Sequence, residues 1–91
     1  MIYGLVVSFN PDHEKLRCLI NSLKKANVIP FVIDNASVDF LNPLCDFVRL
    51  DKNYGIAKAQ NIGIEYALSH AATVIVFFDQ DSSISDPEFI N

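Results

Sequence analysis

The fold is decided by residues 2–33, IYGLVVSFNPDHEKLRCLINSLKKANVIPFVI. The stretch begins with a short apolar run, Ile2 to Val7, which predicts a buried strand. Asp12 can cap the helix that follows, in which apolar residues recur at helical spacing. A second strand is expected at Ile29 to Ile33, with Pro30 near its start, where a missing N–H donor is tolerated. Together these features predict a βαβ unit with parallel strands.

The alternation of strands and helices continues outward from this unit. The further expected elements are a loop over Asp34 to Pro43, a strand over Phe47 to Leu50, a turn at Asn53-Tyr54-Gly55, a helix over Ile56 to Ala72 and a strand over Thr73 to Phe78. Because the strands are near-continuous apolar runs, both faces of the sheet are expected to be covered. The sequence thus predicts an α/β fold, with an open, mainly parallel sheet in the order 3-2-1-4 and helices on both faces.

Composition narrows the classes of function. The chain has 91 residues, enough for one small domain, and a formal net charge of -4. An acidic balance argues against nucleic-acid binding, which needs a basic surface. The longest apolar run, Ala71 to Phe78, is too short for a transmembrane segment. Cys18 and Cys45 lack metal-ligand spacing and are too few for a disulfide framework, so we expect a cytoplasmic protein, with the inner face of the membrane as an alternative location.

Polar side chains follow every expected strand. The residues in these segments are Ser8, Phe9 and Asn10 after the first strand, Asp34, Asn35 and Ser37 after the second, Asp51, Lys52 and Asn53 after the third, and Asp79, Asp81 and Ser82 after the fourth, and all but Phe9 are polar. In open α/β sheets, ligands bind beyond the carboxyl ends of the strands, so these groups are expected to form a site. Neither G-x-G-x-x-G nor G-x-x-x-x-G-K-[ST] is present, which disfavours dinucleotide oxidoreductases and P-loop NTPases.

Asp79-Gln80-Asp81 is a candidate site for a metal and a diphosphate. In an extended segment, residues two apart point to the same side, with Cα atoms about 6.6 Å apart. Two carboxylates that face one way repel each other unless a cation lies nearby, and carboxylate oxygens suit Mg²⁺ or Mn²⁺. Taken alone, the pattern is equally compatible with a solvated turn.

Two further segments have both a binding and a structural interpretation. The carboxylate of Asp34 would accept a hydrogen bond from a nucleobase ring N–H, but Asp, Asn and Ser also form turns by bonding their own backbone. Small and amide residues alternate from Asn53 through Gly55 to Asn61 and lead into a helix, whose N-terminus favours anions. Such small residues also permit close packing of helix on sheet. The sequence leaves these interpretations open.

Four motifs, taken in order, resemble the donor-site motifs of family-2 (GT-A type) glycosyltransferases. They are Val6-Val7-Ser8-Phe9-Asn10, Val32-Ile33-Asp34-Asn35-Ala36-Ser37, Asn53-Tyr54-Gly55-Ile56-Ala57-Lys58-Ala59-Gln60-Asn61-Ile62-Gly63 and Phe77-Phe78-Asp79-Gln80-Asp81-Ser82. The likeness extends over nearly the whole chain. The last motif is most similar to the bacterial rhamnosyltransferase branch, whose donor is dTDP-rhamnose. The resemblance implies the nucleotide-binding half of a GT-A (Rossmann-like) fold.

The resemblance also implies roles for individual residues. The implied nucleotide-binding residues are Ser8, Asn10, Asp34, Asn53, Gly55, Asn61 and Asp79. Asn10 would line the nucleoside pocket, Asp34 would contact the pyrimidine, and Asn61 would flank the pyrophosphate. Asp79 and Asp81 would bind Mg²⁺ or Mn²⁺, with Asp81 as the main ligand. The implied donor is a nucleotide-diphosphate sugar, dTDP-rhamnose or a UDP-sugar, and the implied acceptor is a glycan or a lipid-linked molecule. Transfer would be inverting, with a carboxylate base acting on the acceptor hydroxyl.

We expect residues 1–91 to be a truncated N-terminal, nucleotide-sugar-binding part of such an enzyme. A helix start is expected at Ser85-Asp86-Pro87, one turn before Asn91, and no residue is identified as the catalytic base. The chain is therefore expected not to transfer sugar by itself. The fourth strand would form an apolar edge of the sheet, which favours a homo-oligomer.

Two other classes of function compete with this interpretation. The first is a non-catalytic module that binds a nucleotide or a partner through the same pocket. The second is a phosphotransfer or phosphatase-type α/β domain with Asp79 as nucleophile. The position of the motif near the C-terminus and Ser83 two residues after Asp81 disfavour the second class.

Overall fold

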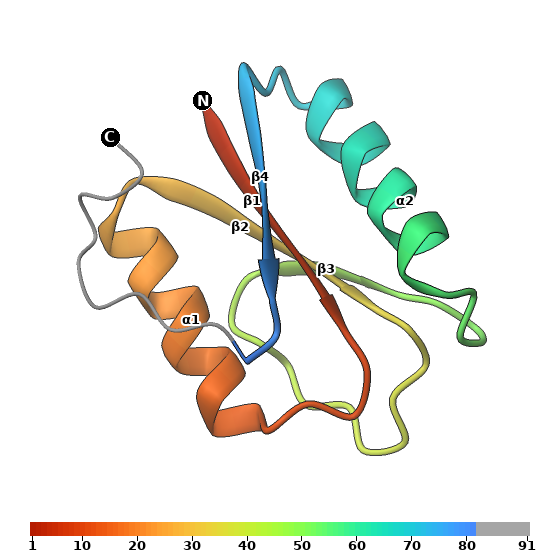
Figure 1. The fold of residues 1–91 in the computed structure, drawn as a ribbon. Coiled ribbons are helices and arrows are strands. Elements are labelled where there is room, and N and C mark those ends of the chain that lie inside the picture. Colours follow the sequence, from red (N-terminus) through yellow and green to blue (C-terminus); the bar gives the residue numbers. More distant parts are fainter. Residues whose placement is uncertain (82–91) are drawn as a thin grey trace.

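The computed structural model describes residues 1–81 as a three-layer α/β arrangement. Its elements along the chain are β1 (Ile2–Ser8), α1 (His13–Lys25), β2 (Val28–Asp34), β3 (Asp46–Arg49), α2 (Ile56–Ser69) and β4 (Val74–Asp79). The four strands pair in parallel in the order β3-β2-β1-β4 (Figure 1). The predicted fold class and strand order are thereby confirmed. The helix start expected at residues 85–87 lies outside the described residues.

The two helices cover opposite faces of the sheet (Figure 1). Side chains alternate along each strand, so that Leu5 of β1 packs on the α2 side and Val6 on the α1 side. The face of α1 that packs on the sheet carries Leu16, Leu19, Ile20 and Leu23, which are all buried. Its N-terminus is capped as predicted, because the Asp12 side chain accepts a hydrogen bond from the Lys15 N–H at 3.1 Å. Each face of the sheet therefore has its own hydrophobic cluster.

The helix α2 lies close to the sheet because its buried residues are small. They are Ala59, Gly63 and Ala67. A Cβ atom on Gly63 would lie 2.7 Å from Ile33 Cδ1 and 3.0 Å from Leu5 Cδ1, so a larger residue would push the helix outward. The packing interpretation is confirmed for Ala59 and Gly63, whereas Asn61 on the same helix is exposed.

Several element boundaries differ from the predicted ones. The helix α2 ends at Ser69 rather than Ala72, because Ala71 adopts a left-handed conformation (φ 63) that stops it. The strand β3 lies one residue earlier than expected. Pro30 is the third residue of β2, and it is tolerated there because β3 pairs only with Phe31 to Asp34. Within residues 1–81, neither α1 nor α2 has the length and hydropathy of a membrane-spanning helix.

Candidate functional site

An open cleft of about 550 Å³ lies beyond the carboxyl ends of β1, β2 and β4, beside the start of α2. Its lining residues are Val7, Phe9, Asn35, Asn53, Gly55, Ile56, Asp79, Gln80 and Asp81. The structure therefore brings together Asn53, Gly55, Asp79 and Asp81 of the residues selected from the sequence. It does not place Ser8, Asn10, Asp34 or Asn61 on the cleft surface.

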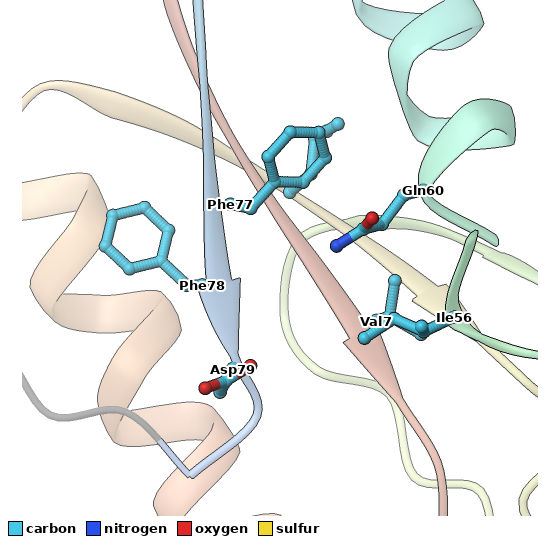
Figure 2. Close-up of a pocket in the computed structure, with 7 residues that line it drawn as sticks. Val7, Ile56, Gln60, Phe77, Phe78 and Asp79 are labelled. Atoms are coloured by element: carbon cyan, nitrogen blue, oxygen red, sulfur yellow. The ribbon is translucent and has the colours of Figure 1, made fainter.

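A smaller hollow of about 160 Å³ adjoins the cleft between β4 and α2. Val7, Ile56 and Asp79 line both spaces. Figure 2 shows Phe77 on the α2 side of β4, near Gln60, and Phe78 on the side of α1. Apolar side chains of β1, β4 and α2 line the hollow together with Gln60 and Asp79.

The segment from Asp79 to Asp81 is not extended, and this part of the sequence prediction was wrong. Asp79 is the last residue of β4, while Gln80 and Asp81 form a turn. The reason is that the pairing of β1 with β4 stops at Val7 and Asp79, so the backbone beyond has no strand to follow. Both carboxylates are nevertheless exposed, and both line the cleft.

The chemistry of this carboxylate pair fits Mg²⁺ or Mn²⁺. Mg²⁺ uses one or two protein carboxylates and completes its shell with waters and substrate phosphates. In the described part of the chain, no three His, Cys, Asp or Glu side chains form a group that could hold a metal ion. Asp79 and Asp81 would therefore hold a cation together with ligands from outside residues 1–81, such as water and the phosphates of a substrate.

Asp34 is fully buried beneath the cleft. Its Oδ1 accepts hydrogen bonds from the Oγ atoms of Ser8 (2.8 Å) and Ser37 (2.5 Å), and its Oδ2 accepts one from the Ser37 N–H (2.9 Å). The Arg49 Nε lies 3.7 Å from Oδ2. The turn-forming interpretation of Asp34 therefore describes this structure. Contact with a nucleobase stays a prediction, and it would require the carboxylate to exchange some of these bonds.

Asn10 connects the loops that follow β1 and β2. Its N–H donates to Ser37 Oγ at 2.8 Å, and its Oδ1 accepts from the Val38 N–H at 2.9 Å. It lies beside a separate hollow with His13 and Asp39. Asn10 thus holds two loops in place in this structure, and its predicted role in nucleoside binding stays a prediction, as do those of Ser8 and Asn61.

Two amide residues of the cleft were not among the site residues selected from the sequence, although Asn35 was noted as a polar residue after the second expected strand. Asn35 is 3% exposed, and its side chain bridges to the next loop, donating to Gly55 O and accepting from Tyr54 N–H, both at 3.3 Å. Gln80 bonds the backbone of Phe9 on the neighbouring strand end. Both residues lie inside the motifs named in the sequence analysis. Each is an amide residue directly beside a selected aspartate, and this position could have identified them.

The start of α2 is positively charged and has no side-chain cap. Gly55 at the N-cap has φ 88, a conformation that favours glycine, and no side chain within residues 1–81 bonds the first N–H groups of the helix. The Nζ atoms of Lys52 and Lys58 lie 5.1 and 4.8 Å from the centre of the Tyr54 ring. The Tyr54 hydroxyl donates to Asp51 at 2.7 Å, and this bond lowers the pKa of that carboxyl. Free N–H groups and cations together favour an anion at this end of the cleft.

Comparison with known proteins adds an independent finding. Residues 5–90 match the model of glycosyl transferase family 2. The dTDP-rhamnosyl transferase RfbF of Shigella flexneri is 42% identical over 99 aligned residues, which cover 98% of this chain and 32% of RfbF. The chain thus spans about a third of the length of that curated relative. No solved structure matches the chain significantly.

Proposed function

The chain belongs to glycosyl transferase family 2, and we propose that it forms the part of such an enzyme that binds the nucleotide-diphosphate sugar donor. The observation that carries this proposal is the cleft at the carboxyl ends of the strands. Two exposed carboxylates, Asp79 and Asp81, line the same space as Gly55 at the uncapped start of α2. Few ligands need both a cation site and an anion site in one cleft, and a metal-bound diphosphate is one of them.

The two ends of the cleft would contact different parts of a metal-bound diphosphate. Asp79 and Asp81 would hold Mg²⁺ or Mn²⁺, and the free N–H groups of α2 would face the phosphate oxygens, with Lys52 and Lys58 adding positive charge nearby. Asn35 also lines the cleft, where its buried amide, bonded to Tyr54 and Gly55, would hold this loop beside the nucleoside.

The likeness to RfbF supports a dTDP-rhamnose donor, with a UDP-sugar as the alternative. The acceptor would be a glycan or a lipid-linked molecule, and the reaction an inverting transfer. A carboxylate base takes the proton of the acceptor hydroxyl, whose oxygen bonds to the anomeric carbon as the bond from that carbon to the diphosphate oxygen breaks. A metal held by Asp79 and Asp81 would supply positive charge that stabilises the departing diphosphate. We place the enzyme in the cytoplasm, at the inner face of the membrane where a lipid-linked acceptor would lie.

The metal site is tested by Asp81→Ala. Removal of a metal ligand should weaken dTDP binding by at least about tenfold in Mg²⁺, with less than about a twofold change in EDTA. Isothermal calorimetry on the 91-residue chain measures both affinities. Glu65→Ala, which removes an exposed carboxylate of α2 outside the cleft, serves as the matched control. Equal losses with and without metal would show that Asp81 is not a ligand.

A further inference from the structure

A side chain continues the contact between β1 and β4 after their backbone pairing has ended. The last pair in register is Val7 with Asp79. One residue later, Gln80 Oε1 accepts from the Phe9 N–H at 2.7 Å, and Gln80 Nε2 donates to the Phe9 carbonyl at 3.2 Å. A carboxamide has a donor and an acceptor side by side, as a peptide group of a neighbouring strand would. The Gln80 side chain therefore takes the place of strand backbone beside Phe9.

This pair of hydrogen bonds, which we call the Gln80 clamp, lies between the two carboxylates of the cleft. Gln80 separates Asp79 from Asp81 in the sequence, so the bonds of its side chain to Phe9 restrain the turn that carries Asp81. On the other side of the clamp, Phe9 precedes Asn10, which is bonded to Ser37 and Val38. The clamp thus links the carboxylate pair to the loops after both β1 and β2.

We propose that Gln80 is a positioning residue, which sets the place of the Asp79 and Asp81 carboxylates relative to the loop after β1. The inference rests on the proposed function, since it assumes that this pair binds a metal. Mg²⁺ demands near-octahedral geometry with short bonds to oxygen, so its affinity is sensitive to small displacements of a ligand. Without a bound cation the two carboxylates repel each other, and a fixed turn opposes their separation.

The clamp itself is measurable without any ligand. Hydrogen exchange of the Phe9 amide, followed by NMR on the 91-residue chain, reports the bond to Gln80 Oε1. In Gln80→Met, which keeps the length of the side chain but cannot bond, we expect exchange of this amide to rise at least about tenfold. In Gln80→Glu the acceptor remains, and exchange should stay slow. The backbone N–H of Asn35 donates to the Ser8 carbonyl at 2.8 Å, and its exchange rate should be unchanged in both variants. An unchanged Phe9 amide in Gln80→Met would overturn the clamp.

The positioning role is tested by the affinity for dTDP in Mg²⁺ and in EDTA. We expect Gln80→Met to weaken the Mg²⁺-dependent affinity by about tenfold and the metal-free affinity by less than about twofold. The control is Asn21→Met, the same kind of change on the exposed side of α1. A lower melting temperature with an unchanged ratio of the two affinities would make Gln80 a stabilising residue only, and would overturn the proposal. Absence of any metal effect in the unaltered chain would instead refute the proposed function, whatever the Phe9 amide shows.

Discussion

At the scale of single residues, the buried carboxylate of Asp34 holds neighbouring segments together beneath the cleft. Two serine hydroxyls and one backbone N–H donate to it, and the partly exposed Arg49 balances its charge from 3.7 Å. Arg49 is itself fixed, because its Nη2 donates to the Ser37 carbonyl at 2.6 Å and its guanidinium lies 5.3 Å from the centre of the Phe40 ring. The arrangement makes Asp34 important for the fold whether or not it contacts a nucleobase.

We expect Asp34→Ala to lower the free energy of unfolding by about 3 kcal/mol, because the donors of Ser8 and Ser37 lose their acceptor in a buried place. Urea unfolding measures the loss, and Asp39→Ala in the same loop, where the carboxylate is exposed, should stay within about 0.5 kcal/mol of the unaltered chain. We also expect weaker binding of nucleoside and nucleotide, with or without metal. Unchanged binding by the folded variant would leave Asp34 with the turn-forming role alone.

The two cysteines differ in environment and should differ in reactivity. Desolvation by burial raises the pKa of the Cys45 thiol to about 11, against a smaller opposing effect of Lys24. A raised pKa keeps the thiol protonated, so at pH 8 only about one molecule in a thousand carries the reactive thiolate. Cys18 is exposed on α1. In a time course with iodoacetamide, mass spectrometry should find Cys18 modified first and Cys45 only slowly, with Cys45 speeding up as the pH rises toward 11. Equal rates at pH 8 would contradict the burial of Cys45.

At the scale of secondary structure, the sequence predicted the elements better than their ends. The helix α1 has a capping Asp12 and four buried apolar residues at helical spacing, two signals that agree, and both were confirmed. The C-terminal end of α2 was placed too late, because no glycine or proline marks it. Ala71 takes the left-handed position that glycine usually fills, and an alanine carries no signal for that conformation.

Replacing Ala71 by Gly should therefore stabilise the protein. The Ala71 N–H donates to Leu68 O at 3.2 Å and the Ala72 N–H to Ala67 O at 3.0 Å, a helix-ending pattern that suits glycine. Relief of the left-handed strain of alanine should raise the free energy of unfolding by about 1 kcal/mol. The matched control is Ala57→Gly, an exposed position with helical backbone, where the same change should cost up to about 1 kcal/mol. Denaturant melts of the two variants should shift in opposite directions, and a destabilised Ala71→Gly would contradict this account of the helix end.

At the scale of the whole molecule, the sequence predicted which strand ends meet but not which side chains face the ligand space. Asp79, Asp81, Asn53 and Gly55 converge on one cleft because parallel strands bring their carboxyl ends to one edge of the sheet. Asp34 lies at the same edge and yet points inward, because a serine from β1 and another from its own loop saturate it. Such burial depends on contacts between segments that are distant in sequence. The sequence pattern of a single strand does not predict these contacts.

Within residues 1–81, β4 forms one edge of the sheet and β3 forms the other. Among residues 1–81, β4 pairs only with β1, and Val74 and Phe77 are 48% and 44% exposed. The homo-oligomer expected from the sequence stays a prediction.

The last prediction is that this 91-residue chain binds a nucleotide diphosphate in Mg²⁺ without transferring sugar. Of the titratable side chains in residues 1–81, only Asp79 and Asp81 line the cleft, and both are proposed as metal ligands, so neither is free to act as the base. Base catalysis alone contributes about 10²–10⁴-fold to a rate. The relative RfbF is about three times as long as the matched stretch, which leaves ample chain for a base and an acceptor site in a complete enzyme. A coupled assay measures the rate of dTDP release from dTDP-rhamnose with each of a panel of acceptors. We expect this rate to equal the rate without protein. Acceptor-dependent release that Asp81→Ala abolishes would contradict this prediction and would show that the 91-residue chain carries its own catalytic base.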